Sequence, residues 1–377
     1  MIEWLTTLVG FDTQNPPGRE VEAASWLAQT LESFGLDARI DDARPGRSNV
    51  IAELRNGEGP TFAFNSHIDV VPVGDGWSSD PFRLREEHGR LYGRGACDAK
   101  GAIAGMLEAV CRLSAERSQW RGTLLAVFVA DEETESRGAK AYAETGRKID
   151  YAVIGEPTSN GVVTAHKGSL RPVVAVSGKS AHSGTPDLGI NAVYAAAKLL
   201  GLIEREHRDS VSHHNHPLCG SASLTVTRIH GGHADNVVPE RCELLLDRRM
   251  VPGEDEERVK AEIEQLFEVA RAEFGVAAEI VGYQPTTGGA TETDAAHPIV
   301  RAALEASKAR GVTAPGPGGF QGGCDLVHFR SMGAQGIVVG PGSLAAAHKP
   351  DEFVPVNELL VSSLIYRDIA LTMLGIS

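Results

Sequence analysis

Apolar runs of strand length alternate with stretches of helical periodicity in the first third of the chain. Runs typical of strands cover residues 49–54, 61–64 and 123–130, and apolar residues recur at helical spacing over 21–34 and 103–113. Strands that alternate with helices form a largely parallel sheet that the helices cover. The sequence therefore predicts an α/β domain with a mostly parallel sheet and helices on both faces.

The middle of the chain has a different rhythm, with two successive strands between two helices. The expected elements are strands at 171–176, 222–229, 238–246 and 277–283, and helices at 190–206 and 255–274. This βαββαβ order predicts an inserted α+β domain. A chain of 377 residues is also longer than a domain with one hydrophobic core usually is. We therefore expect a first domain from residues 1–169 and 284–377, and an inserted domain from residues 170–283.

Residue types that ligate metals follow the apolar runs at five places in the chain. The stretches are 65–69, 93–98, 131–133, 155–157 and 347–352, and together they supply two histidines and several carboxylates. Ligands gather beyond the carboxyl ends of parallel strands, so we expect these stretches to meet at one edge of the sheet. Such a ligand set suits two divalent cations side by side, which activate a water for hydrolysis.

The first two stretches each offer a specific arrangement. In a strand, His67 and Asp69 would share a face, so the Asp69 carboxylate could accept the second ring N–H of His67. Asp98 precedes a predicted helix, whose dipole favours a carboxylate that stays ionised while it bridges two cations. Taken alone, the first pair could be a strand-end histidine near a surface aspartate, and Asp98 could be a helix N-cap.

Two adjacent glutamates follow the third predicted strand. Consecutive side chains diverge at a strand end, so one of Glu132 and Glu133 can ligate a metal while the other takes a proton from the attacking water. Acidic pairs are also common on protein surfaces, which is the alternative for this motif.

The predicted inserted domain has candidate residues of its own. Arg249 carries a fixed guanidinium that could bind a substrate carboxylate through two hydrogen bonds, although it could also be an ordinary surface arginine. His182 lies in a predicted loop, and Asn236 precedes a predicted strand.

Charge and cysteine content narrow the class of protein. A formal net charge of -14 argues against nucleic acid or an anionic membrane as a partner, because both need a basic surface. The five cysteines are odd in number and form no Cys-x-x-Cys pair, which favours free thiols in a reducing compartment. The N-terminal residues have neither a basic patch nor a long apolar run. We therefore expect a cytoplasmic protein.

With these motifs in place, the chain resembles, almost end to end, a family of co-catalytic zinc amidohydrolases and exopeptidases. That family includes acetylornithine deacetylase, succinyl-diaminopimelate desuccinylase and glutamate carboxypeptidase. The resemblance implies two divalent ions per chain, with zinc the first choice and cobalt or manganese also suited to nitrogen and oxygen ligands. It implies a role for each motif residue: His67 and Glu156 on one ion, Glu133 and His348 on the other, Asp98 bridging, Glu132 as general base, and Asp69 orienting His67.

The same resemblance gives the inserted domain the role of a lid and dimerisation domain. His182 matches a histidine that, in dimeric relatives, reaches the partner subunit's active site and stabilises the oxyanion. Asn236 and Arg249 match lid residues that bind the substrate's carbonyl and carboxylate. The resemblance also implies a homodimer and a cis peptide bond between Asp98 and Ala99.

The substrate class stays open between related choices. Residues 153–168 and 339–352 look most like acetylornithine deacetylase, which implies hydrolysis of an N-acyl amino acid. Residues 322–325 look more like the desuccinylase and carboxypeptidase branch. A desuccinylase, a dipeptidase or a carboxypeptidase therefore remains an alternative, since each cleaves an amide beside a carboxylate. A non-catalytic binding relative would be expected to lose the base or a ligand, and this sequence keeps them.

Overall fold

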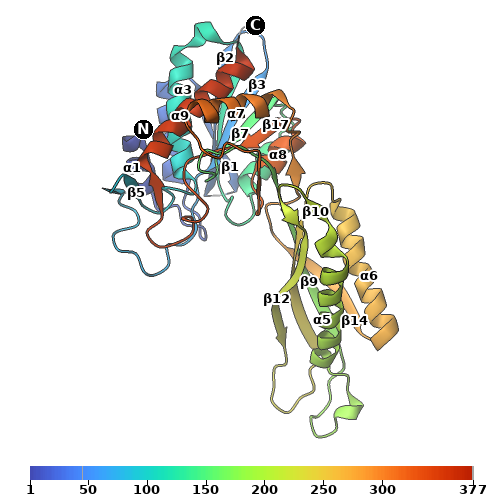
Figure 1. Cartoon of the computed structure of the whole chain (residues 1–377). Coiled ribbons are helices and arrows are strands. Elements are labelled where there is room, and N and C mark those ends of the chain that lie inside the picture. The colour runs from blue at the N-terminus through green and yellow to red at the C-terminus, as the bar shows by residue number, and fades with distance from the viewer. Residues whose placement is uncertain (45, 376–377) are drawn as a thin grey trace. The chain divides into compact units, whose positions relative to one another are not determined.

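The computed structural model describes residues 1–44 and 46–375 and divides into two compact units (Figure 1). The first unit comprises Met1–Ala165, Glu292–Gly319 and Cys324–Ser377. The second comprises His166–Thr291 and Phe320–Gly323, a wider range than the expected 170–283. The two units are described separately below.

The first unit is built on a nine-stranded mixed sheet. In spatial order its strands are β1 (Asp37–Arg44), β2 (Arg47–Asn56), β6 (Gly122–Val129), β3 (Thr61–His67), β7 (Tyr151–Ile154), β17 (Gln335–Val338), β8 (Val163–His166) and β15 (Thr291–Glu292), with β16 (Gly318–Phe320) paired to β8. Strands β6, β3, β7 and β17 run parallel. The predicted parallel sheet is confirmed in this centre, and antiparallel pairings flank it at β1, β2 and β8.

Parallel strands send their carboxyl ends to the same edge of a sheet. His67 is the last residue of β3, and the segment 131–133 begins just after β6. Glu156 follows β7 by two residues, and the loop that carries His348 follows β17. The topology therefore brings four of the five motif stretches to one edge.

Helices cover both faces of this sheet. The main core joins Phe62 and Phe64 of β3 to apolar residues of α1 (Ile2–Gly10), α2 (Val21–Ser33), α3 (Lys100–Ala115), α7 (Pro298–Ala309) and α9 (Val356–Leu374). On the other face lie α4 (Arg137–Glu144) and α8 (Leu326–Ser331), where the rings of Tyr142 and Phe329 are 6.1 Å apart. A small sheet of β4 (Arg85–Glu87), β5 (Arg90–Tyr92) and β18 (Phe353–Pro355) completes the unit, with a 3-10 turn at Arg117–Gln119.

The second unit is an antiparallel sheet with two helices. Its strand order is β12 (Ser223–Gly231), β13 (Arg241–Met250), β9 (Gly168–Ser177) and β14 (Ala277–Gln284). Along the chain, α5 (Ala192–Asp209) and α6 (Glu256–Phe274) complete the predicted βαββαβ order. The remaining elements are the hairpin of β10 (Asn215–His216) and β11 (Gly220–Ser221) and the 3-10 turns Pro186–Leu188 and Val211–His213.

Local sequence explains the bounds of both helices in this unit. The side chain of Asn191 accepts the N–H groups of Val193 and Tyr194 at the start of α5, and Asp255 accepts that of Arg258 at the start of α6. Helix α6 ends at Phe274, and its C-cap residue Gly275 has a φ of 66°, which suits glycine. Its buried face consists of Val259, Ile263, Leu266, Phe267 and Ala270. Among the described residues, no helix of either unit is both long and apolar enough to cross a bilayer.

Candidate active site

The motif residues of the first unit form one cluster around the carboxylate of Asp98. Its Oδ1 lies 3.1 Å from Nε2 of His67, and its Oδ2 lies 3.2 Å from Nε2 of His348. The predicted cis peptide follows, between Asp98 and Ala99. Ala99 is the N-cap of α3, which has no side-chain cap, so the N-cap alternative for Asp98 does not hold. One carboxylate thus contacts two histidines that are 281 residues apart in the sequence.

The remaining carboxylates lie on either side of Asp98. Oε2 of Glu133 is 3.1 Å from Nε2 of His348, and Oε2 of Glu156 is 3.9 Å from Nε2 of His67. Ligand atoms of His67, Glu132 and Glu156 lie within 4.8 Å of one another, as do those of His67, Asp98 and Glu133. The structure therefore offers two overlapping groups of nitrogen and oxygen donors.

Burial and mutual repulsion dominate the electrostatics of the cluster. Burial raises the pKa of Glu132 and of Glu156 well above the usual carboxyl range, and neighbouring carboxylates raise both further. Burial raises the pKa of Asp98, but hydrogen bonds with His348 and His67 outweigh it and hold this pKa below the usual range. Hydrogen bonds to Asp98 and Glu133 raise the pKa of His348 to about 10.

These residues fit a pair of divalent cations. Buried charges in proteins are normally paired or coordinate metals, and here several carboxylates share two histidines. Oε1 of Glu133 is buried without a partner among the described residues. Imidazole nitrogens and carboxylate oxygens are the donors that zinc and similar ions accept.

Asp69 has a different contact from the predicted one. Nδ1 of His67 lies 2.8 Å from the backbone oxygen of Asp69, whereas the Asp69 carboxylate is 3.8 Å away. That carboxylate accepts the backbone N–H groups of Glu132 at 3.0 Å and Glu133 at 3.2 Å. The reason is that β3 ends at His67, so the alternation of a strand does not extend to Asp69. Asp69 therefore contacts the histidine with its backbone and the two glutamates with its side chain.

A buried polar network behind this turn was not predicted. The side-chain amide of Asn15 donates to the carboxylates of Asp69 and Asp131, both at 2.9 Å. Arg47 pairs with Glu20 at 2.8 Å and with Asp131 at 3.0 Å. The signal in the sequence was Asn15 itself, a polar residue directly before two prolines. The network fixes the segment that carries both glutamates.

A further buried carboxylate, that of Asp325, was also missed as a site residue. It is 1% exposed, and burial raises its pKa to about 7. Its charge raises the pKa of both Glu132 and Glu156. Its position after Gly322, Gly323 and Cys324, at the start of α8, was the available signal.

Two candidate residues of the second unit, His182 and Asn236, lie on neighbouring loops, and the third, Arg249, lies in a strand. His182 is exposed, and its Nδ1 accepts the N–H of Gly184 at 3.0 Å. Asn236 is also exposed, and its backbone oxygen accepts the N–H of Ser183, so these two loops are neighbours. Arg249, in β13, donates to both carboxylate oxygens of Asp247, at 2.7 and 3.2 Å.

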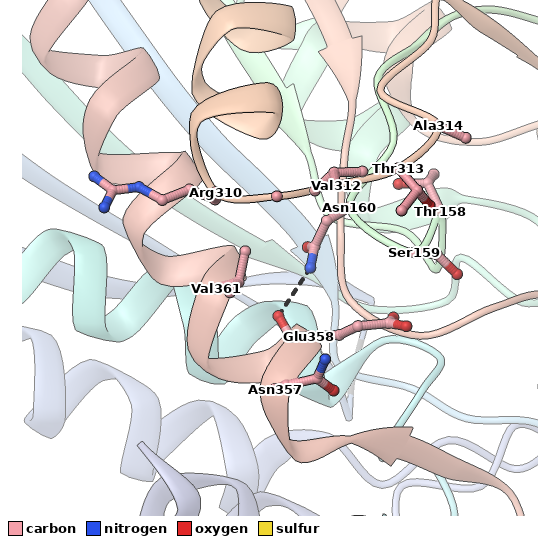
Figure 2. Close-up of a pocket in the computed structure, with 11 residues that line it drawn as sticks. Thr158, Ser159, Asn160, Arg310, Val312, Thr313, Ala314, Asn357, Glu358 and Val361 are labelled. Atoms are coloured by element: carbon pink, nitrogen blue, oxygen red, sulfur yellow. Dashed lines mark hydrogen bonds between the residues drawn. The ribbon is translucent and has the colours of Figure 1, made fainter.

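A separate surface pocket lies beside the loop that follows Glu156 (Figure 2). Its lining comes from residues 158–160, 310–314 and the start of α9. The amide of Asn160 donates to the backbone oxygen of Glu358 at 2.9 Å, across the pocket wall. None of the residues that line it is one of the predicted ligands, so we place the candidate site at the Asp98 cluster.

Fold and site together define a metal-dependent hydrolase, with two overlapping groups of nitrogen and oxygen donors at the carboxyl edge of a parallel sheet. The sequence profile of Peptidase family M20/M25/M40 matches residues 63–372. The chain belongs to this family. Its relatives there include deacylases and peptidases, and the chain is an enzyme that acts on amides.

Individual relatives agree with this assignment. The acetylornithine deacetylase of Myxococcus xanthus is 35% identical over 94% of this chain and 93% of its own length. A probable succinyl-diaminopimelate desuccinylase of Staphylococcus epidermidis is 29% identical over 98% and 96%. The fold matches that of aminopeptidase PepT from Bacillus cereus, with a TM-score of 0.81, 22% identity and coverage of 99% and 97%. It also matches YxeP of Bacillus subtilis, described as a dinuclear metal binding peptidase, with a TM-score of 0.77, 20% identity and coverage of 99% and 97%.

Proposed function

We propose that this chain hydrolyses the amide bond of an N-acyl amino acid, in the manner of acetylornithine deacetylase. The observation that carries the proposal is the contact of the Asp98 carboxylate with both His67 and His348. The deacetylase of Myxococcus xanthus, at 35% identity, supports the substrate class. The 29% identical relative named as a desuccinylase supports a succinyl group as the alternative, and a dipeptide or a carboxypeptidase substrate is the other.

The contacts of each residue support the ligand assignment that the family resemblance implies. We assign His67 and Glu156 to one zinc ion, Glu133 and His348 to the other, and Asp98 to both. Cobalt or manganese would suit the same donors. Two such ions, when bound, acidify a shared water and polarise the amide carbonyl.

Glu132 is the group that we assign to proton transfer. It neighbours the proposed ligand Glu133 in the sequence. Its backbone N–H donates a hydrogen bond to the Asp69 carboxylate, which fixes the position of its backbone. Burial and nearby carboxylates raise its pKa, which makes it a better proton acceptor than an ordinary glutamate. It would take a proton from the attacking water and deliver it to the nitrogen of the leaving amine.

The second unit would supply the substrate contacts. We assign the substrate's α-carboxylate to Arg249, whose guanidinium is already oriented by Asp247. Asn236 would bind the carbonyl, and His182 would stabilise the oxyanion from the lid of a partner subunit in a homodimer. The exposure of His182 and Asn236 supports contacts made outside their own unit. The five cysteines form no disulfide among the described residues, which supports a reducing, cytoplasmic compartment.

A substrate panel tests the proposed reaction. We expect zinc-loaded protein to release acetate from N-acetyl amino acids with a higher kcat/KM than it shows on N-succinyl amino acids or dipeptides, measured by amine release. Treatment with a chelator should abolish the activity, and added zinc should restore it. Full activity in metal-free protein would refute the proposed mechanism, and a preference for succinyl or dipeptide substrates would select an alternative.

The two adjacent glutamates should differ in their effects. Glu132→Gln should keep both zinc ions and lower kcat by about 10²–10⁴-fold, because it removes the base and no ligand. Glu133→Gln should lower zinc content, because it removes a ligand. Metal analysis and steady-state kinetics measure both effects, and Glu135→Gln is the control. The reverse pattern would show that the two roles are exchanged.

Mixed dimers test whether His182 acts on the partner subunit. Glu132→Gln chains and His182→Ala chains should each be nearly inactive. If subunits exchange, one site of a mixed dimer has an intact base and receives His182 from the partner chain. We expect partial recovery of the wild-type rate. No recovery, despite subunit exchange shown by native mass spectrometry, would mean that His182 acts within its own chain or has no role.

A further inference from the structure

Glu352 connects two segments that carry proposed ligands. It lies four residues after His348, and its side chain is 1% exposed. Its Oε1 accepts the backbone N–H groups of Cys97 at 2.9 Å and Asp98 at 3.0 Å. One buried carboxylate oxygen therefore satisfies the amide of the proposed bridging residue and that of the residue before it.

Arg94 fixes the other oxygen of the same carboxylate. Its Nη1 donates to Oε2 of Glu352 at 2.5 Å, and the arginine side chain is also 1% exposed. Its Nη2 donates to the backbone oxygens of Pro72 at 3.2 Å and Val73 at 3.3 Å, and its guanidinium lies over the Trp77 ring at 5.1 Å. Arg94 is thus held on several sides, so the carboxylate that it binds has little freedom.

The contacts of Glu352 should affect the binding of one proposed ion more than that of the other. Asp98 and His348 lie on the two segments that Glu352 joins, and both are assigned to the ion that Glu133 also binds. Among the residues that the structure describes, the Glu352 side chain has hydrogen bonds with the Asp98 segment and Arg94, and none with the segment of Glu156. Loss of this link should therefore weaken binding of the ion assigned to Glu133 and His348 more than binding of the ion assigned to His67 and Glu156.

We propose that Glu352, oriented by Arg94, is a positioning residue that holds Asp98 in register with His348. It thereby sets the affinity for the metal ion assigned to Glu133 and His348, called the second ion below. The proposal rests on the ligand assignment in the proposed function. Residues that orient ligands from outside typically change metal affinity by about 10–100-fold when they are lost. The link acts through the backbone, because the oxygen of Glu352 accepts two N–H groups that would otherwise be buried without a partner.

Two double variants separate positioning from general stability. Changing Glu352 alone would leave a buried, unpaired arginine, so both charges are removed together. Arg94→Met/Glu352→Gln keeps an amide oxygen that can accept the two N–H groups, whereas Arg94→Met/Glu352→Leu removes the acceptor. The loss of the arginine is common to both variants, so their difference isolates the acceptor.

The measurement is calorimetric titration of zinc into metal-free protein, with the unfolding temperature of each metal-free variant recorded. We expect the Gln variant to bind two ions with affinities close to wild type, and the Leu variant to bind the second ion about 10–100-fold more weakly. The control is Glu116→Gln, because Glu116 also forms a two-contact pair with an arginine far along the chain, Arg367, at 2.8 and 2.9 Å. It should bind both ions as wild type does.

Each other outcome decides the question. If the Leu variant binds two ions at wild-type affinity, the proposal is overturned. It is also overturned if the Gln and Leu variants lose affinity for both ions to the same extent. If the Leu variant does not fold, Arg94→Met/Glu352→Met takes its place, since methionine also lacks the acceptor and its flexible side chain fills a buried space more readily. A second ion bound severalfold more weakly would then support the proposal, and wild-type affinity would overturn it. Wild-type protein that binds no zinc would instead refute the proposed function.

Discussion

The organisation of the site depends on the Asp98 carboxylate and its contacts with two histidines. His67 ends a central strand, and His348 lies in a loop near the other end of the chain, so only the folded sheet can bring both to one carboxylate. Each histidine is flanked by a further carboxylate, Glu156 or Glu133. This crowding of negative charge is costly in a buried site unless cations balance it, which is why the donor set favours metal ions.

The polypeptide around the site is held by carboxylates that bind backbone N–H groups. Asp69 holds the amides of Glu132 and Glu133, and Glu352 holds those of Cys97 and Asp98. Each of these carboxylates also accepts a hydrogen bond from another side chain, that of Asn15 for Asp69 and that of Arg94 for Glu352. Rigid support of this kind keeps the proposed ligands and the proposed base in place, which matters because misplacement by about 1 Å can cost about 10²-fold in rate.

The sequence predicted the parts of the molecule that follow from local pattern. Apolar periodicity predicted the parallel centre of the sheet and the extent of α6, and the rule that ligands gather at strand ends predicted where the candidate ligands meet. The antiparallel flanks of the sheet were not predicted. The contact of Asp69 was not predicted either, because strand alternation stops at His67. Partners such as Asn15 and Asp131 lie 116 residues apart, and no local pattern records such a contact. The substrate contacts assigned to the second unit stay a prediction.

The central claim is that Asp98 joins two metal ions, and anomalous X-ray diffraction from crystals of the zinc-loaded chain tests it most directly. Data collected on both sides of the zinc absorption edge should give two anomalous peaks per chain, each at ligand distance from one oxygen of Asp98, with His67 beside one peak and His348 beside the other. A single peak, no peak, or two peaks that Asp98 does not join would contradict the account.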